Sequence, residues 1–433
     1  MKTRSISLLA AVVVAAAAQS VHADAVQTVF VIAMENHNWT VNGSGYVGDP
    51  TTGAGSNLAV FNNPAAPYIN SLVNGTNPVS SQVSYAKNYN QPGQGEHPSE
   101  PNYVWAEAGT NFNPIATGTA TSTTQGTITG FTINNDNDPT VANKNILTNV
   151  PHLTGQMNAA GVTWKNYQED YQILNSTTPT GGSVLVSKSG TSTTVTNPYY
   201  NTNQYNYAAK HDPMAFFTDT QTQNVATFDQ LRADITADTG SGAVNNFGKY
   251  NWITPNQYND QHSSITGTFT YHGVGYTGNQ SAVATGDNFL ATIIPQIMAT
   301  DAYKNNGAIV IWNDETENGD TAGFTSMEIV ISPLAHPNVG GLPYGSTVTM
   351  NHSSDIKTME EIFGLPMIDN AIPTSETFQN VAGQYATVIG SNDLSDLFAA
   401  GTIPAPIGAV PEPASLAVLS LGALGLLARR RRA

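Results

Sequence analysis

The chain contains no cysteine among its 433 residues. Disulfide bonds are therefore excluded, and the fold must be stabilised by a hydrophobic core, with or without a bound metal ion. No Pro/Ser-rich linker, block of charge or internal repeat divides the stretch from residue 24 to about 400. We therefore expect one large domain rather than two.

Basic residues are also scarce, with 15 Lys and Arg against 31 Asp and Glu. Six of the basic residues lie at the two ends, as Lys2, Arg4 and the run Arg429 to Arg432, where Glu412 is the one acid. Without those ends the chain has 9 basic and 30 acidic residues, a net charge of −21. Such a surface repels nucleic acids and anionic membranes, so we expect no nucleic-acid partner. The excess of acids instead points to bound cations.

The N-terminal sequence is MKTRSISLLAAVVVAAAAQSVHADA. It joins a basic start to a short apolar run and then to the small residues that precede a cleavage site. This pattern predicts a secretory signal peptide over residues 1–23, cut after Ala23.

At the other end, Val-Pro-Glu-Pro at 410–413 is followed by an apolar run of about 15 residues and four arginines. The run is shorter than the roughly 20 residues of a comfortable spanning helix. This order resembles the PEP-CTERM sorting tail, which implies that residues 410–433 hold the protein transiently in the inner membrane until an exosortase-type protease removes them. An ordinary C-terminal anchor with arginines inside is the alternative. Both readings export the domain to the periplasm, the cell surface or the medium.

Short apolar runs rich in β-branched residues alternate with helical patterns. The predicted strands are Gln27 to Met34, Val162 to Tyr167, Ala308 to Trp312 and Met327 to Ile331. The predicted helices are Pro101 to Ala108, Pro151 to Ala160, Asn288 to Ala299 and Asp355 to Phe363. This alternation predicts an α/β domain over residues 24–366, with a mostly parallel central sheet and helices on both faces.

Long polar stretches interrupt this pattern and are expected to be surface insertions around the sheet. They are Thr110 to Asn145, Leu174 to Tyr207 and Ser263 to Gln280. Residues 367–409, rich in Ala, Gly, Thr, Ser and Pro, are expected to be a spacer before the tail.

Polar clusters follow the predicted strands, where reactive groups collect in open α/β sheets. They are Glu35-Asn36, Glu169-Asp170, Asn256 to His262, and Asp314-Glu315. Carboxylates with an amide and a histidine are typical ligands of a divalent metal. For Glu35-Asn36 and for Glu169-Asp170 taken singly, a solvated strand end is the alternative.

The stretch Gly95-Glu-His-Pro-Ser-Glu-Pro-Asn-Tyr103 places Ser99 at or just before a helix start, because Pro101 fits the first helical turn. Free backbone N–H groups and the positive helix end favour a bound phosphate and an ionised hydroxyl there. Two interpretations stay open: Ser99 is a nucleophile, or it is simply the N-cap. His97, two residues earlier, either orients Ser99 or caps a loop.

Seven segments in order extend over about residues 27 to 366: VFVIAMENHNW, HPSEPNYVWAEAG, GVTWKNYQED, KHDPMAFF, WITPNQYNDQHS, GAIVIWNDETENGD and NHSSDIKTMEEIFGLP. Together they resemble the phosphoesterase family that contains acid phosphatases and phospholipases C, a branch of the alkaline phosphatase superfamily. The sulfatase branch is disfavoured, because its Cys/Ser-x-Pro-x-Arg pattern requires an arginine where Tyr103 stands.

The resemblance implies that Ser99 attacks phosphorus and that a divalent ion assists, either zinc, calcium, manganese or iron, with one or two ions left open. The metal ligands it implies are Glu35, Asn36, Asp314, Glu315 and Asp260. The resemblance also implies that His211, His262 and His352, together with Asp260, bind a second metal or the phosphate, and the three histidines are the further candidates for a catalytic role.

Three functions follow from these residues. The first is an acid phosphatase-type phosphomonoesterase that forms a phosphoserine, and the second is a phospholipase C or other phosphodiesterase. The third is a non-catalytic extracellular matrix protein that keeps the fold. The intact set of Ser99, Glu35, Asn36 and Asp314 argues against the third, because a scaffold does not need it.

Overall fold

The computed structural model describes residues 25–90, 98–109, 136–143, 145–172, 183–240, 242, 246–317, 323–368 and 391–405. The predicted signal peptide, the sorting tail, His97 and most of the insertion from Thr110 to Asn145 lie outside these ranges. Within the described ranges, no helix combines the length and the apolar character that a membrane crossing requires.

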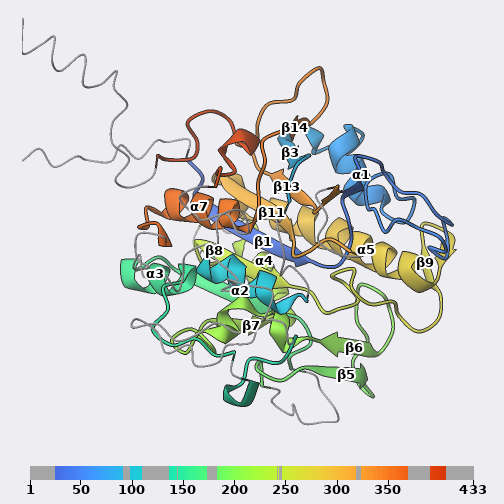
Figure 1. Ribbon diagram of the computed structural model, residues 1–433, viewed down its shortest axis with the longest axis horizontal. Coiled ribbons are helices and arrows are strands. Elements are labelled where there is room, and N and C mark those ends of the chain that lie inside the picture. The colour runs from blue at the N-terminus through green and yellow to red at the C-terminus, as the bar shows by residue number, and fades with distance from the viewer. Residues whose placement is uncertain are drawn as a thin grey trace, which may run out of the picture.

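An eight-stranded sheet forms the centre of the molecule (Figure 1). Its strands, in spatial order, are β14 (Tyr344–Ser346), β3 (Val83–Ala86), β13 (Glu328–Ile331), β11 (Gly307–Asn313), β1 (Thr28–Met34), β8 (Tyr250–Thr254), β4 (Trp164–Gln168) and β7 (Val225–Thr227). All neighbours pair in parallel except β13, which is antiparallel to both β11 and β3. The mostly parallel sheet is confirmed.

The strand predicted over Met327 to Ile331 therefore exists but runs opposite to the direction expected of a parallel sheet. A parallel neighbour of β11 would need a crossover connection, usually a helix. The described part of the connection, residues 314–317 and 323–327, contains no helix, and its two-residue strand β12 (Phe324–Thr325) pairs with β2 (Thr40–Val41). β13 thus returns beside β11 in the antiparallel direction, as the second strand of a hairpin does.

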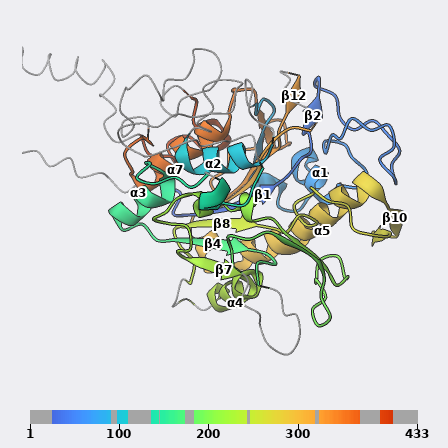
Figure 2. The same ribbon diagram turned by 60° about the horizontal axis from the view of Figure 1, so that its bottom comes forward.

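Side chains of the central strand β1 enter two separate cores in alternation, as the pleat of a strand requires. Val29, Val31 and Ala33 pack under α2 (Glu100–Ala108), α3 (Leu153–Ala160) and α7 (His352–Phe363). Phe30, Ile32 and Met34 pack under α1 (Pro67–Asn74), α4 (Phe228–Asp238), α5 (Gly278–Ala299) and α6 (Asp301–Lys304). Helices on both faces are thus confirmed (Figure 2), and burial on both faces explains why the strand sequence is continuously apolar.

All four predicted helices are present, although α5 starts ten residues before its predicted first residue, Asn288. Sequence reasoning overlooked this part because it is rich in small and polar residues, yet Val283 and Ala284 in it are fully buried. The described parts of the later insertions form two hairpins, β5 (Lys188–Thr191) with β6 (Gln204–Tyr207) and β9 (Phe269–Tyr271) with β10 (Val274–Tyr276).

Residues 391–405 (red in Figure 1) belong to the domain rather than to a spacer. Leu394, Leu397 and Phe398 are buried in the core beneath α7. The backbone N–H of Val26 donates to the carbonyl of Thr402 at 3.3 Å. The spacer predicted over residues 367–409 is wrong for this segment, because three large apolar side chains in an otherwise small and polar sequence suffice to bury it.

Buried Glu107 in α2 makes folding stability pH-dependent. Its Oε2 accepts hydrogen bonds from the N–H (3.0 Å) and the hydroxyl (2.7 Å) of Thr154 at the start of α3. Burial raises the pKa of Glu107 to about 8, whereas an unfolded glutamate has a pKa of about 4.3. The stabilising effect of its proton is therefore complete below about pH 4 and is lost as the pH rises toward 8.

We expect Glu107→Gln, which cannot ionise and still accepts from Thr154, to melt at nearly the wild-type temperature at pH 5. At pH 8 it should melt above wild type by about 2 to 4 °C. Melting curves between pH 5 and pH 9 measure this, with Asp229→Asn at an exposed position of α4 as the control for losing a carboxylate. If the difference in melting temperature between Glu107→Gln and the wild type did not change with pH, this would contradict a protonated Glu107 in the folded protein.

Candidate active site

The carboxyl ends of β1, β8 and β11 bring four acids to one edge of the sheet. Glu35 follows β1 directly, Asp314 and Glu315 follow β11, and Asp260 lies in the loop after β8. Backbone hydrogen bonds tie these ends together, from Glu35 N–H to the Asp260 carbonyl at 2.8 Å and from Asp314 N–H to the Met34 carbonyl at 3.1 Å. The three strands thus fix the relative positions of the acids.

Asn36 turns the chain out of β1 immediately after Glu35. Its φ of 45° lies in the left-handed region, which asparagine tolerates better than most residues. In this conformation the backbone N–H of Asn36 donates to Asp314 Oδ1 at 3.3 Å. Asn36 therefore orients Asp314 through its main chain, and the ligand role predicted for its side chain stays a prediction.

Ser99 lies between two of the acids at the start of α2. It is 2% exposed, and its Oγ is 3.2 Å from Glu35 Oε2 and 3.2 Å from Glu315 Oε1. Asn102, one helical turn later, donates to the other oxygen of Glu315 at 3.2 Å. The Ser99 side chain makes no capping hydrogen bond to the helix. Ser99 thus occupies the N-cap position of α2, but its hydroxyl is directed at the acidic cluster and not at the helix N–H groups.

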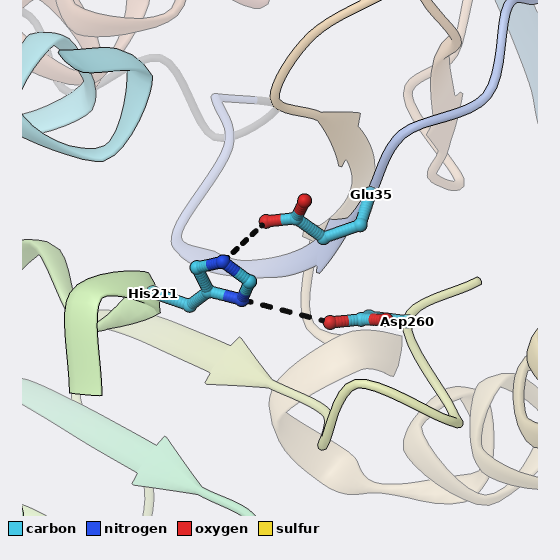
Figure 3. Close-up of side chains that lie close together, drawn as sticks. All are labelled: Glu35, His211 and Asp260. Carbon is cyan, nitrogen blue, oxygen red and sulfur yellow. Dashed lines mark ion pairs between the residues drawn. The ribbon is translucent and has the colours of Figure 1, made fainter. Parts of the chain in front are cut away.

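His211, in the short helix η3 (Ala209–His211), lies between Glu35 and Asp260 (Figure 3). Its Nε2 is 3.2 Å from Glu35 Oε1, and its Nδ1 is 3.7 Å from Asp260 Oδ2. Among the described residues, neither His211 Nε2 nor Asp260 Oδ2 has a hydrogen-bond partner. Both atoms are directed at the space between Glu35, His211 and Asp260, as the donor atoms of a shared ion are.

Tyr103 contacts both Glu35 and His211. Its hydroxyl donates to Glu35 Oε1 at 2.6 Å, and its ring stacks on the His211 ring with centroids 4.8 Å apart and planes 8° apart. In the sequence, Tyr103 is notable only as the residue at the position of the sulfatase arginine. The available signal was its spacing of four residues from Ser99, which puts both side chains on one helix face.

In the part of the chain that the structure describes, two groups of side chains could hold a divalent metal, and both include Glu35. One is Glu35, Asp314 and Glu315, and the other is Glu35, His211 and Asp260, with donor atoms within 4.8 Å of one another in each group. Carboxylate oxygens and an imidazole nitrogen are ligands that zinc and other divalent ions accept in proteins. The donor set therefore fits an ion.

The electrostatics favour a cation as well. Burial, followed by repulsion from Asp314 and Glu315, holds the pKa of Glu35 well above its usual range. Burial and the charge of Glu315 raise the pKa of Asp314 in the same way, and burial lowers the pKa of His211 well below its usual value. A divalent ion would reverse the cost of ionising these acids and would bind neutral imidazole.

His262 is close to this cluster. Its ring centroid is 6.0 Å from that of His211, and its backbone N–H donates to Asp260 Oδ1 at 2.7 Å. Its Nδ1 contacts Ser263 Oγ at 3.0 Å. His262 is only partly buried, in contrast to His211.

His352, in contrast, has a different position from the one predicted. It is fully buried, and its Nδ1 accepts from the indole N–H of Trp312 at 2.9 Å while its Nε2 donates to the Asp314 carbonyl at 2.7 Å. Both ring nitrogens thus bind protein groups, and the predicted catalytic role of His352 stays a prediction. The sequence placed His352 near the site but could not reveal that it lies behind Asp314 and holds its backbone.

Glu169 is not a solvated strand end either. Asn197 Nδ2, Asn259 Nδ2 and the Asn256 N–H all donate to its carboxylate, at 2.6 to 2.9 Å. Glu169 is buried and fastens the loop that leads to Asp260.

Residues 93–366 match the sequence profile of the phosphoesterase family. The chain belongs to the phosphoesterase family. Ser99, His211, Asp260, His262, Asp314 and Glu315 all lie inside the match, whereas Glu35 and Asn36 precede it. The predicted family is confirmed, and this phosphoesterase is a hydrolase of phosphate ester bonds.

Residues 409–432 match the PEP-CTERM protein-sorting motif. This confirms the sorting tail and indicates export, exosortase-type sorting and delivery to the cell envelope or surface. A comparison with curated proteins gives no match.

Several solved structures are similar to this phosphoesterase. A protein in the alkaline phosphatase superfamily from Vibrio parahaemolyticus is 9% identical, with 81% of this chain and 71% of that chain covered and a TM-score of 0.43. A protein from the metabolism of multiple glycosaminoglycans in Bacteroides thetaiotaomicron is 8% identical, with 88% and 83% covered and a TM-score of 0.43. A 2-O GAG sulfatase is 11% identical, with 82% and 73% covered and a TM-score of 0.38.

Glu35 is the residue whose loss should remove both candidate metal groups. We expect zinc or manganese to raise the melting temperature of the wild type and chelation to lower it, because the ion offsets repulsion among buried acids. Glu35→Gln should lose this response. Glu107→Gln, at a buried acid of α2 outside both groups, is the control and should keep it. Melting curves with and without chelator, together with metal analysis, measure the effect; wild-type metal content in Glu35→Gln would contradict the site.

Proposed function

We propose that this phosphoesterase is a metal-dependent phosphomonoesterase whose nucleophile is Ser99. The observation that supports this most strongly is the position of Ser99 Oγ, 3.2 Å from carboxylate oxygens of both Glu35 and Glu315 and not engaged in capping α2. A hydroxyl held by two acids that also form a metal-type cluster is prepared for attack rather than for helix capping.

Ser99 Oγ attacks phosphorus in line with the leaving alcohol, and its proton passes to the facing carboxylate of Glu35 or Glu315. The bond between phosphorus and the leaving oxygen breaks, and that oxygen takes up a proton. Water then attacks the phosphoserine, which releases phosphate and restores the Ser99 hydroxyl. A bound divalent ion would lower the pKa of that hydroxyl and withdraw charge from the phosphoryl oxygens.

The two histidines take different roles in this proposal. His211 lies between Glu35 and Asp260 and serves as a ligand, with Tyr103 keeping its ring in place. His262, which is less buried, transfers a proton to the leaving oxygen. Asp314, Glu315 and Asn36 complete the group around Glu35, and Asp260 completes the group around His211. The group with His211 suits zinc, manganese or iron, and the all-oxygen group also suits calcium.

Substitution of Ser99 tests the nucleophile. Ser99→Ala should fold normally while turnover falls by several orders of magnitude, because no other group can supply the covalent route. Ser99→Thr keeps a hydroxyl and should retain measurable activity. Steady-state kinetics with p-nitrophenyl phosphate measure both, with melting curves as the folding control. Near wild-type turnover by Ser99→Ala would remove Ser99 from the mechanism.

The choice between monoester and diester is tested separately on the wild type. We expect hydrolysis of p-nitrophenyl phosphate at a kcat/KM at least about tenfold above that for p-nitrophenyl phosphorylcholine, a difference of about 1.4 kcal/mol in transition-state stabilisation. The reverse order, with Ser99 still required, would assign a phospholipase C-type or other phosphodiesterase activity instead.

A further inference from the structure

Both described ends of the domain lie at the same edge of the sheet. Val26, two residues before β1, donates to Thr402. The segment that leads to Thr402 is fixed at the same edge, because the Leu397 carbonyl accepts from Ser84 Oγ near the start of β3 and from the His336 N–H just after β13. The sorting tail therefore leaves the domain where the parallel strands begin.

The candidate active site lies at the opposite edge. Between Val26 and Glu35 runs the whole of β1, seven residues that span about 23 Å at 3.3 Å per residue. Glu35, Asp260 and Asp314 all follow the carboxyl ends of their strands. The tail and the site are thus separated by the full height of the sheet.

The connection to the apolar part of the tail is short. From Ala405, the last described residue, to Ala414 there are nine steps, which reach at most about 32 Å when fully extended. For the site to touch the bilayer that holds the tail, this connection would have to run nearly straight along the domain. If the connection follows any less extended path, the edge of the sheet where the parallel strands begin, here called the tail edge, lies nearest the membrane.

Charge favours the same orientation. Exposed Lys249 and Lys304 lie just before β8 and β11, at the tail edge. The chain without its two ends carries a net charge of −21, so an anionic membrane repels the domain as a whole. This repulsion is weakest at the edge of the sheet that bears the two lysines.

The geometry points to a domain that, while its tail is in the membrane, stands with the starts of its parallel strands toward the bilayer and its active site directed into the aqueous phase. The substrate, which rests on the proposed function, is then a water-soluble phosphate ester and not a lipid of the same membrane.

Site-specific labelling tests the orientation without any use of activity. Because the chain lacks cysteine, Asn305→Cys at the tail edge and Ser264→Cys in the loop after His262 each give one labelling position. Both positions are exposed. The full chain is inserted in vesicles of phosphatidylcholine and phosphatidylglycerol that contain an acceptor-labelled lipid. A height difference of about 23 Å should give at least about twofold higher energy transfer from position 305 than from position 264.

Equal transfer from the two positions, or higher transfer from position 264, would overturn the orientation. Activity is measured in the same vesicles. We expect p-nitrophenyl phosphate to be hydrolysed as fast as by the full chain in detergent and the vesicle phospholipids to stay intact. Hydrolysis of those phospholipids would overturn the inference about substrate. Transfer as expected without turnover of any ester would support the orientation while contradicting the proposed function.

Discussion

Repulsion among buried carboxylates at the end of one strand is the constraint on which the site depends. Glu35 lies at the carboxyl end of β1, the strand with β8 on one side and β11 on the other, so acids that follow these strands must approach it. Asp260, Asp314 and Glu315 do so with almost no exposure to solvent. Carboxyl groups at this density are stable only when they are protonated or surround a cation, and the two groups that include Glu35 could hold one.

Much of the rest of the structure near the site serves to keep these acids in place. His352 holds the backbone of Asp314 from behind, Glu169 fastens the loop that carries Asp260, and Tyr103 holds Glu35 and His211 together. Each of these residues is buried and contacts a candidate ligand or its loop rather than the space around Ser99. Precision at the site thus comes from polar contacts in a shell around the ligands, a common property of metal centres.

The sequence predicted the strands that carry the site, because continuous apolar runs such as residues 27–34 have few other interpretations. It also predicted which residues follow those strands. It could not show the direction of β13, since strand periodicity is the same in parallel and antiparallel sheets, nor the role of His352, since both depend on contacts between distant segments. The segment 391–405 was misjudged for a similar reason: Leu394, Leu397 and Phe398 are too few to form a pattern, and only the complementary surface of the domain gives them a place.

The pairing of Val26 with Thr402 also bears on how the chain crosses the membrane. The first strand of the domain to be exported is the central one, and its neighbours β8 and β11 arrive only after more than 200 further residues. The last core residues, near Phe398, follow almost at the end of the domain. Folding of so non-local a sheet is slow, and the N-terminal part cannot complete its core alone. The native core of the domain is therefore complete only when the segment just ahead of the sorting signal has joined the first strand.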